Sequence, residues 1–210
     1  MYPYSIEIET INRCNNDCSF CPVNRKNDTL TLKKMSENLY KSIIDQLADM
    51  NYDGYLSLFS NNEPLLDKRL IEFLEYAKRK LPSARLCLFT NGLLLTPETY
   101  EQLTLNLNYL VIDNYSDEML LLPSVKEVYE KYKKQNTSCD VKIYIRKKRQ
   151  ILSSRGGEAP NRFTDTVYEG GCMMPFMQIV IRPDGKISKC CQDGLGSHYV
   201  SNAVTQDKSY

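Results

Sequence analysis

The chain has 210 residues, of which 42% are hydrophobic and 25% charged, and its 27 basic and 26 acidic side chains leave a formal charge of +1. So small a net charge gives no strong attraction to nucleic acid or anionic lipid and argues against a nucleic-acid partner. The chain lacks both the roughly 18 apolar residues of a membrane span and a secretion signal, so we expect a cytoplasmic protein without membrane contact, one ordinary domain in size.

The first half of the chain predicts strands alternating with helices. Residues 5–10 alternate apolar and polar side chains, as a half-buried strand does. Ser36 is expected to cap a helix over 37–49, which a strand at 55–59 follows. Asp67 is expected to cap a second helix that contains Leu70–Ala77, and a strand follows at 85–89.

The alternation continues as far as residue 145. Thr96 and Pro97 occupy favoured positions for the start of a third helix; a strand at 109–112, a helix at about 124–135 and a strand at 141–145 complete the series. Strands that alternate with helices predict an α/β fold, a partial (β/α) barrel of about five to six parallel strands. The loops after the strands should meet at one rim, where such barrels carry their chemistry.

A small C-terminal appendage is expected after the barrel. Residues 146–171 are irregular, first basic and then glycine-containing, so we place the boundary there, with the barrel in 1–150 and the appendage in 151–210. The segments MQIVIR and KISKC flank Pro183, Asp184 and Gly185, a turn sequence that predicts a β-hairpin.

Three of the eight cysteines lie within one short segment. CNNDCSFC spaces Cys14, Cys18 and Cys21 as C-x3-C-x2-C, directly after the first predicted strand. In a reducing compartment such thiols are better explained as metal ligands than as disulfides. A short loop of this kind can hold three corners of a four-iron cluster and leaves one iron without a protein ligand. A zinc site is the alternative, but it needs a fourth ligand, and the only histidine, His198, is far along the chain.

This spacing, with the aromatic Phe20 before the third cysteine, resembles the signature of the radical S-adenosylmethionine (SAM) superfamily. The resemblance implies a [4Fe-4S] cluster whose open iron binds SAM and cleaves it reductively to a 5′-deoxyadenosyl radical, which abstracts hydrogen from a substrate. It also implies that Phe20 lies at the cofactor, and that an external electron donor of the flavodoxin or ferredoxin type reduces the cluster.

Two further loops resemble family motifs in the same order. SNNEP at 60–64 is similar to the Gly-Gly-Glu-Pro loop that holds the SAM amino group, which assigns this role to Asn61, Asn62 and Glu63. Two asparagines replace the glycines, and asparagine also enters left-handed backbone conformations. FTNG at 89–92 is similar to a loop near the SAM ribose, which Thr90 and Asn91 would contact.

A second cysteine group surrounds the predicted hairpin. Cys172, Cys190 and Cys191 resemble the start of the twitch or SPASM segment, which implies a second [4Fe-4S] cluster. Two or three thiols stand where four are usual, and no cysteine follows Cys191. An incomplete cluster, a non-cysteine ligand, a truncated chain and a hairpin with buried thiols all remain open. Cys87 and Cys139 we expect to be structural.

The layout resembles twitch dehydrogenases that oxidise an aminocyclitol alcohol. We therefore predict a radical SAM oxidoreductase that acts on a small polyol or sugar-like molecule. The alternatives are an enzyme that modifies a ribosomal peptide and a non-catalytic iron-sulfur or zinc module. The sequence identifies no catalytic base; Arg146 and Arg155 are candidates for contacts with the substrate or the SAM carboxylate.

Overall fold

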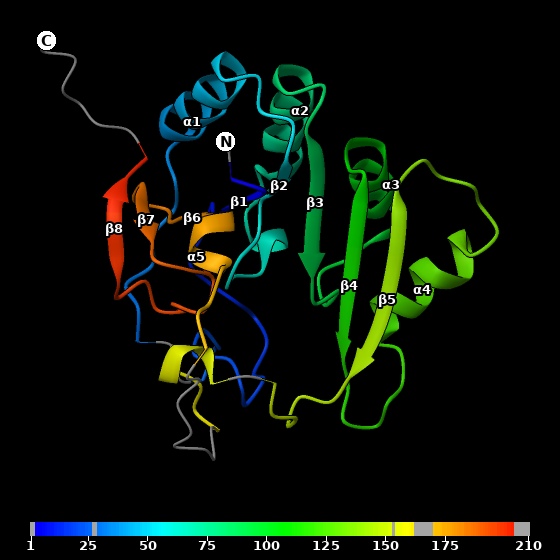
Figure 1. Ribbon diagram of the computed structural model, residues 1–210. Coiled ribbons are helices and arrows are strands. Elements are labelled where there is room, and N and C mark those ends of the chain that lie inside the picture. The colour runs from blue at the N-terminus through cyan, green and yellow to red at the C-terminus, as the bar shows by residue number, and fades with distance from the viewer. Residues whose placement is uncertain (1–2, 27–28, 153, 162–169, 204–210) are drawn as a thin grey trace, which may run out of the picture.

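The computed structural model describes residues 3–26, 29–152, 154–161 and 170–203, and its described strands form one sheet (Figure 1). The strands lie in the order β5-β4-β3-β2-β1-β6-β7-β8. Their bounds are β1 (Ser5–Ile8), β2 (Tyr55–Ser57), β3 (Arg85–Thr90), β4 (Tyr109–Tyr115), β5 (Asp140–Arg146), β6 (Gln178–Ile181), β7 (Lys186–Ser188) and β8 (Tyr199–Asn202). The helices are α1 (Glu37–Asp49), α2 (Leu70–Lys80), α3 (Pro97–Asn106), α4 (Pro123–Tyr132) and α5 (Met174–Met177).

Six neighbouring strands, from β5 to β6, run parallel to one another. Figure 1 shows α1 to α4 along one side of this parallel part, as right-handed crossovers require. The sheet is open, because its end strands β5 and β8 do not pair with each other. The predicted α/β class and the partial barrel of five to six parallel strands are therefore confirmed.

The predicted hairpin is present as β6 and β7, which pair antiparallel around Pro183–Gly185 with Val180 opposite Ser188. Its first strand also pairs in parallel with β1, with Ile6 opposite Ile179, and so supplies the sixth parallel strand. The unpredicted β8 adds a further antiparallel strand. One sheet thus runs through both segments, and the division at residue 150 stays a prediction.

Two of the three predicted helix caps are confirmed. The Ser36 and Thr96 hydroxyls accept hydrogen bonds from the Leu39 and Thr99 amides, each at 3.2 Å. The prediction for Asp67 is wrong, because α2 begins after Arg69 without a side-chain cap. The Asp67 carboxylate caps the turn before the helix, where it accepts from the Arg69 backbone amide at 3.2 Å, and it also binds the Arg69 guanidinium at 2.7 and 2.9 Å.

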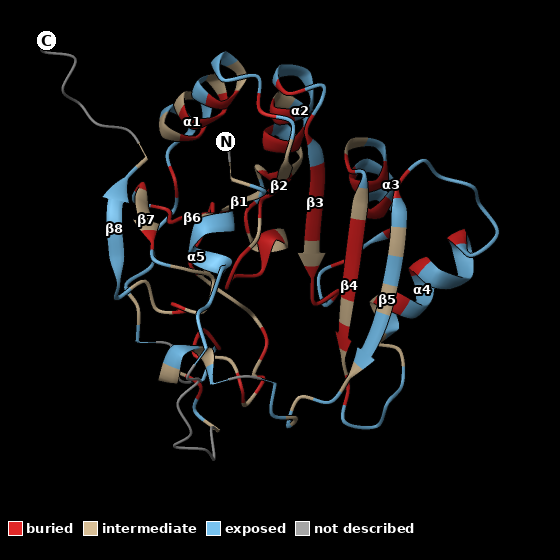
Figure 2. Ribbon diagram, viewed as in Figure 1, coloured by how far each residue is buried: buried red, intermediate tan, exposed pale blue. Residues whose placement is uncertain are grey.

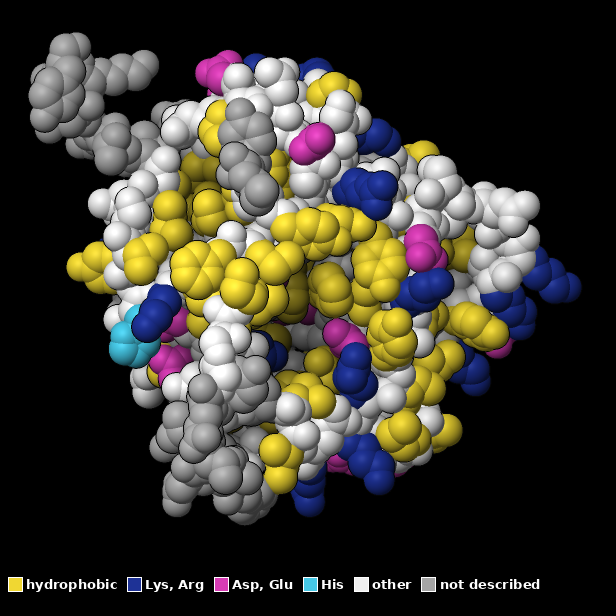
Figure 3. All heavy atoms as spheres, viewed as in Figure 1, with side chains coloured by type: hydrophobic (Ala, Val, Ile, Leu, Met, Phe, Trp, Pro, Cys, Tyr) yellow, Lys and Arg dark blue, Asp and Glu magenta, His cyan; other side chains and the backbone are white. Residues whose placement is uncertain are grey.

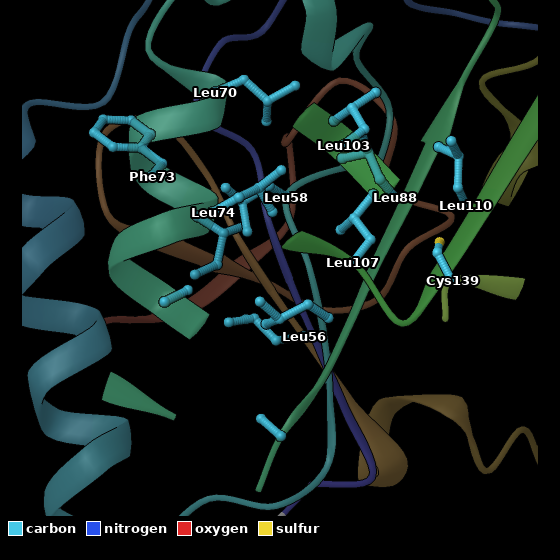
Figure 4. Packing of buried hydrophobic residues seen from close by; sticks show 14 of the residues in the cluster. Leu56, Leu58, Leu70, Phe73, Leu74, Leu88, Leu103, Leu107, Leu110 and Cys139 are labelled. Atoms are coloured by element: carbon cyan, nitrogen blue, oxygen red, sulfur yellow. The ribbon is translucent and has the colours of Figure 1, made fainter. Parts of the chain in front are cut away.

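Strand alternation directs the apolar side chains toward the helices. Ile6 and Ile8 of β1, together with the leucines of β2 and β3, are buried against the helices in one hydrophobic core. Figure 4 shows Leu70 and Leu74 of α2 directed toward these strands, whereas Phe73 stacks on Tyr40 of α1. Figure 2 shows buried residues along β3 and β4, whereas β5 and β8 are largely exposed. The opposite face of the sheet is left for the polar residues described below.

The open side of the sheet exposes apolar side chains. The short helix α5 and the residue before it expose Met173, Met174, Phe176 and Met177. Figure 3 shows hydrophobic side chains in a band across this face of the molecule. Among the described residues, no helix is both long and apolar enough to span a bilayer.

Truncation of a core leucine tests this packing. Leu88 of β3 is fully buried, so Leu88→Ala should lower the free energy of unfolding by about 2 to 5 kcal/mol through lost contacts and the cavity that remains. Leu105→Ala on α3, where 71% of the side chain is exposed, is the control and should change it by less than about 0.5 kcal/mol. Urea titration followed by circular dichroism measures both, and equal losses would contradict the assigned core.

Candidate active site

One pocket gathers the predicted loops at the carboxyl ends of the parallel strands. Its lining includes the cysteines of the first cluster and the predicted contact residues of the two later loops. These are Cys14, Cys18, Phe20, Cys21, Asn61, Asn62, Glu63, Thr90 and Asn91. The structure therefore brings the three loops together at one rim, as the parallel topology requires.

The cysteine loop is held by its own asparagines. The Asn24 side-chain amide donates to the Cys21 carbonyl at 2.7 Å, and the Cys21 amide donates to the Cys18 carbonyl at 3.2 Å. The Asn16 backbone amide donates to the Cys14 sulfur at 3.5 Å. These contacts fold the chain into a tight loop whose three thiols face one cavity.

Two thiols of this loop hold their protons more tightly than a free cysteine does. Burial raises the pKa of Cys14 to about 12, and burial also raises the pKa of Cys18. A metal ligand must be the thiolate, so metal binding here releases protons and offsets the cost of burying charge.

Glu63 joins the second loop to the third. Its Oε1 accepts hydrogen bonds from the Thr90 hydroxyl at 2.7 Å and the Leu65 amide at 3.0 Å, and its Oε2 accepts one from the Asn91 amide at 2.8 Å. Burial raises the pKa of this carboxyl to about 7. A carboxylate offers about four acceptor positions, so one position on Oε2 is open toward a donor such as an ammonium group.

Asn91 ties the third loop to the cysteine loop. Its side-chain amide donates to the Asn15 side chain at 2.8 Å and to the Cys14 sulfur at 3.7 Å. The turn needs glycine at Gly92, where φ is +75° and a Cβ atom would lie 2.5 Å from Val125. The sequence TNG is thus fixed by backbone geometry as well as by its contacts.

The pocket contains buried polar atoms that have no partner among the described residues. They are Nδ2 of Asn16, Nδ2 of Asn62 and Nε of Arg155, and all three residues line the pocket. A buried donor without an acceptor costs free energy, so these groups fit a pocket that is completed by a polar ligand. Three thiols beside such donors suit an iron-sulfur cluster with a polar molecule next to it.

A single-ion zinc site fits less well. Within the described ranges, no three His, Cys, Asp or Glu side chains gather around one point as the ligands of one metal ion would. Cysteines that hold a four-iron cluster each bind a different iron, so they line a cavity and need not converge. The donor set here consists of three free thiols along a pocket wall.

The second cysteine group is only partly assembled. Cys172 is exposed, whereas Cys190 and Cys191 are partly buried, and all three are free thiols. Cys190 lines a second pocket together with His198 and Arg155, and Arg155 is far from the other two in the sequence. Whether these thiols hold a second cluster stays a prediction. Cys87 and Cys139 are buried and do not line the first pocket.

Four further residues of the first pocket were not predicted from the sequence. Phe59, Phe89, Asp113 and Tyr115 line it, and the rings of Phe59 and Phe89 stack with centroids 5.4 Å apart. The predicted strand at 109–112 ended before Asp113, but β4 continues to Tyr115 because pairing with β5 continues to Arg146. Strand alternation applied three residues further would have placed both side chains in the pocket.

The two candidate arginines have different positions. Arg155 lines the first pocket, and it is the one cation among the described lining residues. Arg146 does not line it and instead donates through Nε to Asp113 at 2.7 Å. Arg155 is therefore placed to contact a bound molecule, whereas Arg146 acts on the pocket through Asp113.

A buried ion pair lies below the pocket and was also missed. The Arg182 Nη1 atom lies 2.8 Å from Glu9 Oε2, and both side chains are at most 8% exposed. Arg182 also donates to the Ser188 hydroxyl and the Asp193 carbonyl, while Glu9 accepts from the Asn61 amide at 2.7 Å. The pair thus joins β1, the hairpin and the SNNEP loop, three segments far apart in the sequence.

Glu7 is a further acid on this inner face of the sheet. Its Oε1 accepts from the Gln178 side chain at 2.7 Å, and the Ser60 side chain lies close to the carboxyl. Burial raises the pKa of Glu7 to about 7, so the carboxyl is largely neutral below that pH.

Comparison with known proteins places these features in a family. The family model of the radical SAM superfamily matches residues 8–136. The S-adenosyl-L-methionine-dependent 2-deoxy-scyllo-inosamine dehydrogenase of Niallia circulans is 26% identical over 214 residues, which cover 97% of this chain and 82% of that protein.

Two solved structures share the fold. BtrN in complex with AdoMet and 2-DOIA is similar with a TM-score of 0.77 and 25% identity, over 97% of this chain and 79% of that one. Streptococcus suis SuiB bound to precursor peptide SuiA has a TM-score of 0.68 at 12% identity, over 96% of this chain and 62% of that one. At that identity, the likeness to SuiB shows the fold alone.

The titration of Glu7 should affect stability. Its raised pKa means that the folded chain binds this proton more tightly than the unfolded chain does, so the stability from this group is full below about pH 4.5 and is lost as the pH rises through about 7. The loss is on the order of 3 kcal/mol. Urea titrations of the metal-free chain from pH 5 to pH 8 should show a smaller fall for Glu7→Gln than for the wild type. Glu75→Gln, on the exposed face of α2, should keep the wild-type fall; if Glu7→Gln kept it too, the assignment to Glu7 would be wrong.

Proposed function

The chain belongs to the radical SAM superfamily, and on this premise we propose that it oxidises an alcohol of a small cyclic polyol that carries an amino group. The observation that carries the proposal is the similarity, along 97% of the chain, to a dehydrogenase whose named substrate is 2-deoxy-scyllo-inosamine. The fold likeness to SuiB adds no support for a peptide substrate, because it concerns the fold alone.

The chain's own residues fit the cofactors that this family uses. Cys14, Cys18 and Cys21 would hold a [4Fe-4S] cluster, and the SNNEP and TNG loops would hold SAM, with the open acceptor position of Glu63 toward its amino group. When bound, the cluster and SAM supply a 5′-deoxyadenosyl radical that abstracts hydrogen, and a second cluster at Cys172, Cys190 and Cys191 would supply an acceptor for the electron that remains.

The other residues that line the first pocket suit an amino polyol. Asp113 presents a carboxylate of which Oδ1 is bound by Arg146, and it is proposed to pair with the substrate ammonium group through Oδ2. Arg155 is proposed to donate to substrate hydroxyls, and the aromatic rings of Phe59 and Phe89 offer an apolar surface to the carbon ring. Burial raises the pKa of Tyr115, so this phenol keeps its proton.

Two further parts of the proposal come from the family resemblance. An external one-electron donor of the flavodoxin or ferredoxin type would reduce the first cluster, because that cluster must hold an electron before it can cleave SAM. The protein would work in the cytoplasm, where its thiols stay reduced and free to bind iron.

Replacement of the cysteines tests the cluster assignment. The triple change Cys14→Ser, Cys18→Ser and Cys21→Ser should remove about four irons per chain and abolish 5′-deoxyadenosine formation from SAM and dithionite under anaerobic conditions, because three corners of the cluster lose their ligands. Cys87→Ala, a buried thiol outside the pocket, is the control and should keep both. Deoxyadenosine formation by the triple variant, measured by chromatography, would refute the assignment.

A change at Asp113 tests the substrate class. Asp113→Asn should raise KM for 2-deoxy-scyllo-inosamine by about 10-fold to 100-fold, because a charge-assisted hydrogen bond is lost. KM for the same polyol without the amino group should change little. A similar rise for both substrates would show that Asp113 does not recognise the amine, and no oxidation of either by the wild type would refute the proposed substrate class.

A further inference from the structure

The side chain of Asn61 connects three segments of the chain. Its Nδ2 donates to the Cys191 carbonyl at 3.1 Å, and its Oδ1 accepts from Arg155 Nη1 at 3.3 Å. Its backbone amide donates to Glu9 at 2.7 Å. Asn61 is buried, and it is separated by 94 residues from Arg155 and by 130 from Cys191.

The buried ion pair of Glu9 and Arg182 holds the backbone at Asn61. Glu9 receives the Asn61 amide on Oε1 and Arg182 on Oε2, so the buried ion pair holds the backbone of the SNNEP loop. The same Arg182 donates to the Asp193 carbonyl, two residues after Cys191. The loop and the segment that contains Cys191 are therefore anchored to one buried pair, and the side chain of Asn61 spans the distance between them.

Arg155 depends on this contact for its position. Its backbone has a φ of +48°, a left-handed conformation that is unusual for a residue other than glycine, and Gly156 and Gly157 follow it. Its Nε is buried and has no partner in the described part of the chain, and the side chain lines both the first pocket and the pocket of Cys190. Asn61 supplies the one acceptor that the structure describes for this guanidinium group.

We propose that Asn61 is a positioning residue: its side-chain amide holds Arg155 toward the first pocket and holds the backbone of Cys191 against the SNNEP loop. The inference rests on the proposed function in assigning that loop to SAM and Arg155 to the substrate. A glycine at this position would provide neither hydrogen bond. The asparagine that departs from the family pattern thus mechanically joins the first pocket to the second cysteine group.

Two substitutions separate the two contacts. Asn61→Ala removes both. Asn61→Asp keeps an acceptor for Arg155 and strengthens that bond by its charge, but it places a second acceptor opposite the Cys191 carbonyl in place of the donor. The aspartate should therefore free Cys191 while leaving Arg155 in place.

The first measurement needs no cofactor. Metal-free protein is treated with iodoacetamide, and the alkylation rate of Cys191 is followed by peptide mass spectrometry, with the exposed Cys172 as the internal reference. Asn61→Ala and Asn61→Asp should both raise the Cys191 rate severalfold relative to Cys172. Asn62→Ala is the matched control: it changes the neighbouring asparagine, whose side-chain oxygen binds only Ser60 in the described contacts, and should keep the wild-type ratio.

The second measurement uses the reconstituted enzyme with 2-deoxy-scyllo-inosamine. Asn61→Ala should raise KM by about tenfold, as expected for a lost hydrogen bond to a charged group, whereas Asn61→Asp should stay within about twofold of the wild type. An unchanged alkylation ratio in Asn61→Ala, or an equal rise in Asn62→Ala, would overturn the contact with Cys191. An equal rise of KM in both Asn61 variants would overturn the role toward Arg155. If the wild type oxidises no substrate, the proposed function fails, while the alkylation result still decides the contact with Cys191.

Discussion

Alternation of side chains along parallel strands is the constraint on which the molecule depends. On β1 it sends Ile6 and Ile8 into the core and Glu7 to the opposite face, where Glu9 follows just beyond the strand. The same rule on β4 separates the core residues Leu110 and Ile112 from the pocket residue Asp113. Hydrophobic burial thus stabilises one face while the other is free to carry thiols, acids and arginines.

Buried carboxylates then connect the loops that this face supports. Glu63 joins the SNNEP loop to the TNG loop, and Glu9 joins the SNNEP loop to Arg182 and the hairpin. A carboxylate that is removed from water must be compensated by donors, and both acids receive them from segments distant in the sequence. The cost of burying each acid therefore favours one arrangement of the loops over others.

Local sequence signals predict many of the helices and strands, but they do not predict which residues distant in the sequence contact each other. The caps at Ser36 and Thr96 follow from residue type, and the strands near them follow from the spacing of apolar residues. The three-thiol loop is recognisable by the spacing of its cysteines alone. The pairing of β6 with β1 was not predicted, because an apolar strand does not specify its neighbour. Asp113 was missed because a polar residue ended the apolar run, and the contacts of Asn61 were missed because both partners lie about a hundred residues away.

The position of β1 has a consequence for biosynthesis. One edge of β1 pairs with β2, and the other edge pairs with β6, where Ser5 lies opposite Gln178. During translation the strand that leads into the cysteine loop therefore keeps an open edge until most of the chain has left the ribosome. Closure of so large a loop is slow relative to local helix formation. The sheet that carries the N-terminal thiols is thus complete only after the C-terminal hairpin has arrived.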